Sequence, residues 1–146
     1  MQRKFLKEYF LLSIKPEYAN KIVDGLKSVE LRRRFPEKDF SGSYVIIYSS
    51  SPDKAVIGYA EIDNVTKLSI SELWKKHKNN SYIDYKKFRK YFSGVQEGFA
   101  ISFKKVEKFS KPLSMKDLEK NFKLSPPQSY RYVTEDFFKE LIHATN

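Results

Sequence analysis

Residues 25–34, with the sequence GLKSVELRRR, join the end of a predicted helix to a charged strand. Pro16 stands at the start of an apolar-periodic stretch and Gly25 follows its end, which is the usual placement of proline and glycine around a helix. We therefore predict a helix over residues 16–24. Its apolar stripe, which includes Ile22, indicates that the helix packs on a sheet.

Directly after this helix, residues 27–34 show the period of two that is typical of a half-buried strand. Val29 and Leu31 form the apolar side of this predicted strand. The polar side carries Glu30 and Arg32, which can pair because alternate residues share one face of a strand.

The rest of the chain predicts a mixture of strands and helices. Apolar or alternating runs predict strands over residues 10–14, 44–48, 55–65 and 98–109. Capping residues and apolar periodicity predict helices over residues 71–77, 85–92 and 114–121, and a last helix capped by Thr134. We find no repeat or linker in the sequence. We expect one α+β domain over residues 1–146, a small barrel of about five mostly antiparallel strands with flanking helices.

The composition indicates a folded, basic protein. Hydrophobic residues make up 40% of the chain, which suffices for a core. Lys and Arg number 28 against 18 Asp and Glu, a formal charge of +10, so a polyanionic partner such as RNA or DNA is expected. The lack of cysteine excludes disulfides and thiolate chemistry and fits a reducing, cytoplasmic setting. Apolar runs are far shorter than the ~20 residues that span a bilayer, so no membrane partner is expected.

Lys27, Glu30 and Arg32 bring charges of both signs together within a short segment. Such a cluster can hold a phosphate, a base edge or a substrate carbonyl in a cleft. It can equally be a surface ion-pair array, worth about 0–1 kcal/mol per exposed pair. The neighbouring Arg33 and Arg34 lack a carboxylate of their own, and their planar guanidinium groups match phosphate geometry. Residue spacing leaves both interpretations of the cluster open.

Two further segments have the composition of nucleic-acid contacts. The basic, aromatic helix over residues 85–92 can stack bases, although such a pattern more often buries its aromatic side and exposes its lysines. Residues 125–132 form a stiff loop with two prolines, which either presents hydrogen-bonding groups and a stacking ring or only crosses the surface. His77 and His143 are expected to be exposed helix residues without metal-ligand spacing, so we expect no metal and no cofactor.

The charged segment resembles the ASCH domain family, whose signature is a helix followed by G-x-K-x-x-E-x-R. Here the pattern is met, after the predicted helix, by Gly25, Lys27, Glu30 and Arg32. Residues 48–52 (YSSSP), the predicted strand 55–65 and residues 125–130 (SPPQSY) resemble the branch described as predicted transcriptional regulators. The resemblance covers nearly the whole chain.

This resemblance implies a PUA-like β-barrel, a fold linked to RNA binding and modified-base recognition. It places Lys27, Glu30 and Arg32 in a cleft of that barrel. It also implies that some relatives are enzymes, either ribonucleases or amidohydrolases that act on acylated cytidine with a lysine, a threonine and a glutamate. Glu30 stands where the resemblance places that threonine.

The first functional hypothesis is a module that binds RNA or another single strand in this cleft, with a regulatory role. Phosphate contacts are expected from Lys15, Arg32, Arg33 and Arg34. Base stacking is expected from Tyr18 or Tyr130. The other predicted binding residues are Lys27, Ser49, Ser50, Gln128, Ser129 and Arg131.

The alternative hypothesis is a small hydrolase, a ribonuclease or an acylcytidine amidohydrolase, that works in the same cleft. Lys27 would act as a desolvated base or an electrostatic catalyst, with Glu30 as its acid-base partner. A third hypothesis is an interaction domain whose basic face meets an acidic protein. The sequence leaves the bound base and the oligomeric state open.

Overall fold

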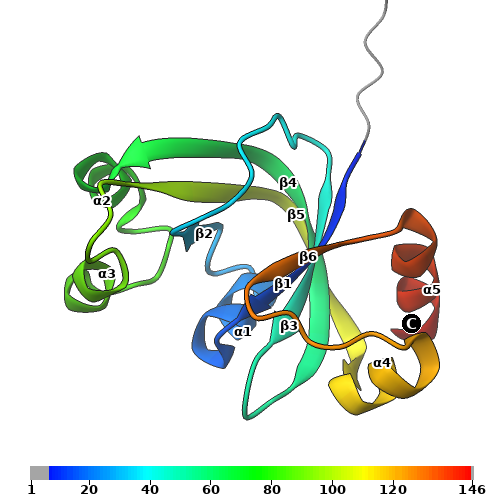
Figure 1. Ribbon diagram of the computed structural model, residues 1–146. Coiled ribbons are helices and arrows are strands. Elements are labelled where there is room, and N and C mark those ends of the chain that lie inside the picture. Colours follow the sequence, from blue (N-terminus) through cyan, green and yellow to red (C-terminus); the bar gives the residue numbers. More distant parts are fainter. Residues whose placement is uncertain (1–6, 146) are drawn as a thin grey trace, which may run out of the picture.

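One six-stranded sheet organises the chain in the computed structural model, which describes residues 7–145 (Figure 1). The strands are β1 (Tyr9–Ile14), β2 (Val29–Arg32), β3 (Tyr44–Ser49), β4 (Ala55–Ser69), β5 (Glu97–Ser114) and β6 (Tyr130–Val133). The helices are α1 (Pro16–Val23), α2 (Ile70–His77), α3 (Tyr85–Tyr91), α4 (Met115–Phe122) and α5 (Glu135–Thr145). These elements confirm the predicted α+β class.

The strands follow the order β2-β5-β4-β3-β1-β6 across the sheet. Within the described part of the chain, β1 pairs with β3 in parallel and the other pairings are antiparallel, as predicted. The longest ladder joins β4 to β5, and these two strands run from α2 at one end of the molecule toward α4 at the other (Figure 1). Three register shifts interrupt this ladder, and such bulges bend and twist a strand pair.

The sheet does not close into the predicted barrel. β2 and β6 are its two edges, and each pairs with a single neighbour. Both edge strands have four residues, which leaves little backbone for a closing ladder. A side chain bridges the gap instead, because Arg32 Nη2 donates a hydrogen bond to Ser129 Oγ over 2.6 Å. Polar side chains therefore occupy the gap between the two edge strands β2 and β6.

Several element boundaries differ from the prediction. The segment predicted as a loop over residues 125–132 ends within β6, which pairs antiparallel with β1. α2 begins at Ile70 rather than after Ser71, because Ser69 Oγ accepts a hydrogen bond from Glu72 N and caps the helix. The predicted cap at Thr134 is confirmed, since its Oγ1 accepts from Phe137 N.

Apolar side chains fill both faces of the sheet. On β1, Phe10 and Leu12 point into a core that also contains Ile22 of α1, whereas Leu11 points into a second core with Leu118 of α4 and Leu141 of α5. Burial on both faces explains why β1 is an uninterrupted apolar run.

A third apolar cluster joins α2 and α3 to the sheet. Leu73, Phe88 and Phe92 pack in it against Leu31 of β2. In the stretch 85–92 the buried-aromatic interpretation is therefore correct for both phenylalanines, while its basic side chains are exposed. β2 itself is buried along its whole length instead of on one face.

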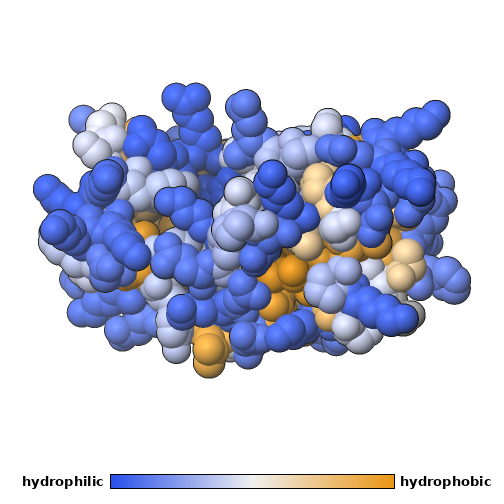
Figure 2. Space-filling model, turned by 90° about the horizontal axis from the view of Figure 1, so that it is seen from below, coloured by the Kyte–Doolittle hydropathy of each residue, from blue (hydrophilic) through white to orange (hydrophobic). Residues whose placement is uncertain are grey.

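The surface reflects the high charge of the sequence. Hydrophilic residues cover most of the face seen in Figure 2, around a smaller apolar area. Among residues 7–145, no helix is both long enough and apolar enough to cross a bilayer.

Candidate functional site

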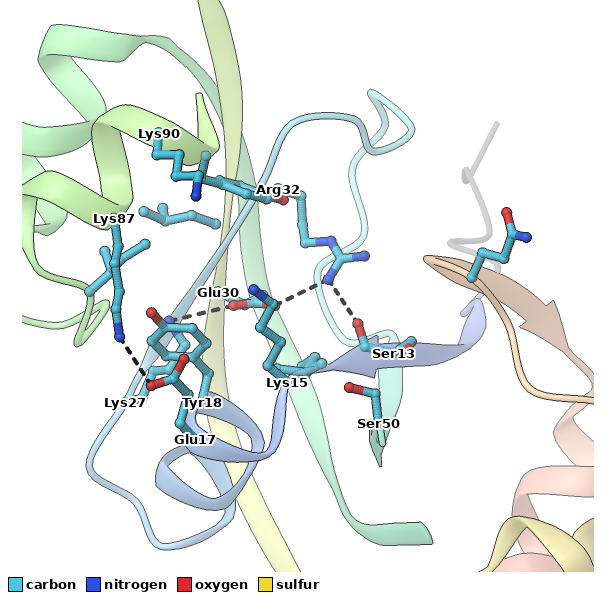
Figure 3. A pocket seen from close by; sticks show the side chains of 15 residues that line it. Ser13, Lys15, Glu17, Tyr18, Lys27, Glu30, Arg32, Ser50, Lys87 and Lys90 are labelled. Atoms are coloured by element: carbon cyan, nitrogen blue, oxygen red, sulfur yellow. Dashed lines mark hydrogen bonds and ion pairs between the residues drawn. The ribbon is translucent and has the colours of Figure 1, made fainter. Parts of the chain in front are cut away.

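A pocket of about 800 Å³ opens beside the N-terminal end of α1 and the buried strand β2 (Figure 3). α3 and the segment before β6 contribute further to its wall. The lining residues are Ser13, Ile14, Lys15, Glu17, Tyr18, Lys27, Glu30, Leu31, Arg32, Ser50, Ile83, Lys87, Lys90, Tyr91 and Gln128.

The three charged residues of the G-x-K-x-x-E-x-R pattern form the floor of this pocket. Glu30 Oε1 lies 3.5 Å from Lys27 Nζ, and Glu30 Oε2 lies 3.2 Å from Arg32 Nη1. The exposed fractions of Lys27, Glu30 and Arg32 are 3%, 6% and 9%. The interpretation as an exposed surface ion-pair array is therefore wrong, because such an array stays in water.

Lys27 is held from several sides. Its ammonium group donates a hydrogen bond to the backbone oxygen of Ser81 and lies 5.2 Å from the centre of the Tyr18 ring. The segment between α2 and α3 brings Ser81 there, since Asn80 O accepts hydrogen bonds from Ser28 N and Val29 N. Burial lowers the pKa of Lys27, and the nearby Glu30 carboxylate opposes that shift.

Arg32 connects β2 to β1 and to the segment before β6. Its Nη1 donates to Ser13 O of β1 over 3.0 Å as well as pairing with Glu30. Its Nη2 donates to Ser129 Oγ, directly before β6. These bonds use the planar fork of the guanidinium group, so a lysine could not replace it.

Lysines surround the mouth of the pocket. Lys15, Lys87 and Lys90 are exposed, and Figure 3 shows them around the buried charges. Lys87 pairs with Glu17 over 3.4 Å, and this contact raises the pKa of Lys87. Within residues 7–145, no carboxylate lies at salt-bridge distance from Lys15 or Lys90.

Two tyrosines complete the walls. Tyr18 is half-buried above the Lys27 ammonium, and burial, with a contribution from Glu17, raises the pKa of its hydroxyl. Tyr91, at the end of α3, is 37% exposed, and its hydroxyl accepts a hydrogen bond from Arg33 N over 3.2 Å. Burial raises the pKa of the Tyr91 hydroxyl as well, so both side chains remain protonated and uncharged near neutral pH, which suits stacking.

The structure brings together much of the predicted site. The predicted residues that line the pocket are Lys15, Tyr18, Lys27, Glu30, Arg32, Ser50 and Gln128. Arg33, Arg34 and Ser129 line a smaller pocket that adjoins it.

Three predicted residues line neither pocket. Ser49 is fully buried and its Oγ donates to Asp53 over 2.8 Å. The half-buried Tyr130 ring packs against Phe10 and Phe35 at the margin of the core and lines neither pocket. Arg131 is exposed on β6.

The predicted site residues include none from α3, although the stretch 85–92 has the composition of a nucleic-acid contact. Lys90 and Tyr91 follow Lys87 by three and four residues, so one side of a helix presents them together, and this spacing was the available signal. Ser81 gave no signal, because only the folded chain places its carbonyl beside Lys27.

His77 is buried rather than exposed as predicted, since the following segment folds over it and Asn80 Oδ1 lies 3.2 Å from its Nδ1. His143 is exposed, as predicted.

Comparison with known proteins agrees with the fold and identifies the family. An "ASCH domain-containing ribonuclease" of Zymomonas mobilis is 29% identical over 139 residues, which cover 93% of this chain and 91% of that protein. The crystal structure of ASCH from Zymomonas mobilis has a TM-score of 0.87 at 27% identity, with 94% of this chain and 96% of that chain covered. The N-terminal domain of Staphylothermus marinus McrB, at 14% identity and a TM-score of 0.58 over 94% of each chain, shares the fold alone. The family model of the ASCH domain matches residues 12–119, and the chain therefore belongs to the ASCH domain family.

Proposed function

We propose that this protein binds single-stranded RNA and takes one nucleotide into the pocket above Glu30. The observation that carries the proposal is a buried carboxylate on the floor of a pocket that is otherwise rich in cations. A phosphate bound beside Glu30 would be repelled by its carboxylate. A carboxylate does accept hydrogen bonds from the amino and imino groups of bases, as in its pairing with cytosine N4.

The surroundings of Glu30 support this assignment. Lys15 and Lys90 at the mouth offer ammonium groups to phosphates, and Tyr18 and Tyr91 offer rings on which an unpaired base can stack. Base stacking of this kind is worth about 1–3 kcal/mol per base. The name of the Zymomonas relative also connects this family with RNA. A regulatory role remains a prediction from the resemblance alone.

Binding of a labelled single-stranded RNA, measured by fluorescence anisotropy over a range of salt concentrations, tests the proposal. The affinity of the wild type should fall as salt is added, and Lys15→Ala/Lys90→Ala should bind more weakly with a shallower salt dependence. Loss of two phosphate contacts should change the slope of log K against log salt by about 1.4.

A charge-matched control is available on α4. Lys116 and Lys120 are exposed and line neither pocket, and α4 lies at the opposite end of the molecule from α3 (Figure 1). Lys116→Ala/Lys120→Ala should therefore bind RNA nearly as the wild type does. Undetectable RNA binding at low salt, or equal effects of the two double variants, would contradict the proposal.

RNA cleavage in the same pocket is a second candidate function, favoured by the name of the Zymomonas relative, a ribonuclease. Glu30 would take up a proton from the attacking hydroxyl group, and Lys27, whose pKa is lowered by burial, would supply positive charge or a proton. Incubation of labelled RNA with the wild type, Lys27→Ala and Glu30→Gln tests this function. Cleavage at equal rates in all three preparations would exclude these two residues as its source.

A further inference from the structure

A second pocket of about 210 Å³ adjoins the first and shares Arg32 and Tyr91 with it. Its other lining residues are Arg33, Arg34 and Ser129, and we call these five residues the arginine pocket. No carboxylate lines it. We propose that the arginine pocket binds the phosphate that links the nucleotide above Glu30 to its neighbour, an inference that rests on the proposed function.

The positive charge of the arginine pocket is only partly compensated. Arg32 is balanced by Glu30. Arg33 Nη1 donates to the backbone oxygens of Tyr91 and Ser93 over 2.7 and 2.9 Å, and these uncharged partners fix the side chain without neutralising it. Arg34 is exposed and makes no ion pair with any residue in the described range 7–145. Two guanidinium charges therefore remain available to an anion.

The two hydroxyl groups of the arginine pocket are set up as donors. Ser129 Oγ accepts a hydrogen bond from Arg32 Nη2, and the Tyr91 hydroxyl accepts one from Arg33 N. Since each oxygen already accepts from a donor, its own proton is left to donate. Phosphate oxygens only accept hydrogen bonds, so a phosphate complements this pair of hydroxyls and the Arg34 guanidinium group.

The relative sizes of the two pockets assign them different parts of a nucleotide chain. The larger one, at about 800 Å³, has room for a base with its sugar, whereas the arginine pocket, at about 210 Å³, suits a phosphate group. The ligand class is thus a nucleotide that carries a phosphate, within an RNA chain, rather than a free base or a nucleoside.

Isothermal titration calorimetry with small ligands tests the arginine pocket directly. The probes are cytidine and guanosine, each as the nucleoside, the 5′-monophosphate and the 3′-monophosphate, together with inorganic phosphate. In the wild type, one monophosphate of the preferred base should bind about tenfold more tightly than its nucleoside. Charge-assisted hydrogen bonds to the phosphate account for a gain of this size. Arg34→Ala should remove most of this advantage and leave the Kd of the nucleoside within about twofold.

Arg89→Ala is the matched control, because Arg89 is an exposed arginine on α3 that lines neither pocket. It should leave the phosphate advantage unchanged. Ser129→Ala and Tyr91→Phe remove one hydroxyl donor each and should lower the advantage by a few fold.

The outcomes separate this inference from the proposed function. If RNA and nucleosides bind but neither monophosphate gains affinity, or if Arg34→Ala weakens nucleoside and monophosphate equally, the arginine pocket is not a phosphate subsite. If inorganic phosphate binds as tightly as the preferred monophosphate, the pocket is a site for free phosphate and the inference is overturned. If neither RNA nor any nucleoside or nucleotide binds, the proposed function fails and the inference fails with it.

Discussion

Glu30 and Arg32 form a buried ion pair on one face of β2, with 3.2 Å between Glu30 Oε2 and Arg32 Nη1. Their separation of two residues places both side chains on the same side of the strand. Arg32 is bound further to Ser13 and Ser129, and Lys27 lies on the other side of the Glu30 carboxylate. The carboxylate thus stabilises two cations that have been removed from water.

Replacement of Glu30 should lower the stability of the fold. Glu30→Ala leaves Lys27 and Arg32 buried without a counter-charge, a situation that costs about 3–5 kcal/mol. Glu17→Ala breaks only the exposed pair with Lys87 and should cost less than about 1 kcal/mol. The free energy of unfolding, measured by urea denaturation, compares the two variants. Equal losses would show that Glu30 does not stabilise the buried cations.

Replacement of Glu30 by an isosteric amide should change base preference. Glu30→Gln keeps the size of the side chain, but its amide both donates and accepts hydrogen bonds, whereas the carboxylate only accepts. Competition among the four homopolymeric RNAs for a labelled RNA should therefore rank the bases differently for the variant and the wild type. An unchanged ranking at reduced affinity would mean that Glu30 does not contact the base.

Local patterns carried much of the information about the fold. The proline and glycine around α1, the strand propensity of β2 and the cap at Thr134 act over a few residues, and the structure agrees with them, although it buries both faces of β2. β6 is different, because residues 130–133 become a strand only by pairing with β1, which lies far away in the sequence. Barrel closure was mispredicted for the same reason, since it depends on how two distant edge strands meet.

In the candidate site too, local features could be predicted from the sequence and long-range ones could not. The charge pattern of Lys27, Glu30 and Arg32 could be found in the sequence because the three residues are neighbours. Their burial could not, because it depends on Ser81, on α3 and on the segment before β6. The contacts of the Tyr130 ring with Phe10 and Phe35 could not be predicted either, because they depend on the pairing of β6 with β1.

Two glycines that are buried against neighbouring elements should respond differently to substitution by alanine. A Cβ at Gly98 would collide with the side chains of Phe92 and Leu73, whereas a Cβ at Gly58 would collide with the backbone oxygen of Glu107. Both variants should lose about 1–3 kcal/mol through overpacking. Phe92→Leu should recover part of the stability that Gly98→Ala loses, because the smaller leucine side chain leaves room for the added Cβ.

A second double-mutant cycle, at positions 23 and 58, is the control for the cycle at positions 92 and 98. Val23 Cγ1 would also lie close to an alanine Cβ at Gly58, at 2.7 Å, but Val23→Ala leaves the backbone collision in place. Thermal denaturation of the single and double variants should therefore show coupling between positions 92 and 98 and much weaker coupling between positions 23 and 58. Equal coupling in both cycles would mean that side chains alone determine the fit.

His77 should make the stability of the fold depend on pH. Burial lowers the pKa of His77 from its usual 6.5, with a further lowering from Lys76 and an opposing hydrogen bond to Asn80. Within the described residues Nε2 of this ring has no hydrogen-bond partner, so a second proton would be left unsatisfied. Because the unfolded chain then binds the proton more readily than the folded one, the free energy of unfolding should fall as the pH decreases below about 6.5, and it should level off below the folded pKa.

Urea denaturation between pH 7.5 and 5, a range of about two and a half units around the usual histidine pKa, measures this effect. His77→Gln should reduce the loss of stability on acidification, whereas His143→Gln, which changes an exposed histidine, should retain the wild-type dependence. The Asn80 side chain contacts His77, its backbone oxygen binds Ser28 N and Val29 N, and the next residue, Ser81, accepts a hydrogen bond from Lys27. Protonation of His77 should therefore also weaken RNA binding in the same pH range. An identical pH dependence in His77→Gln and the wild type would show that the buried ring does not couple protons to folding.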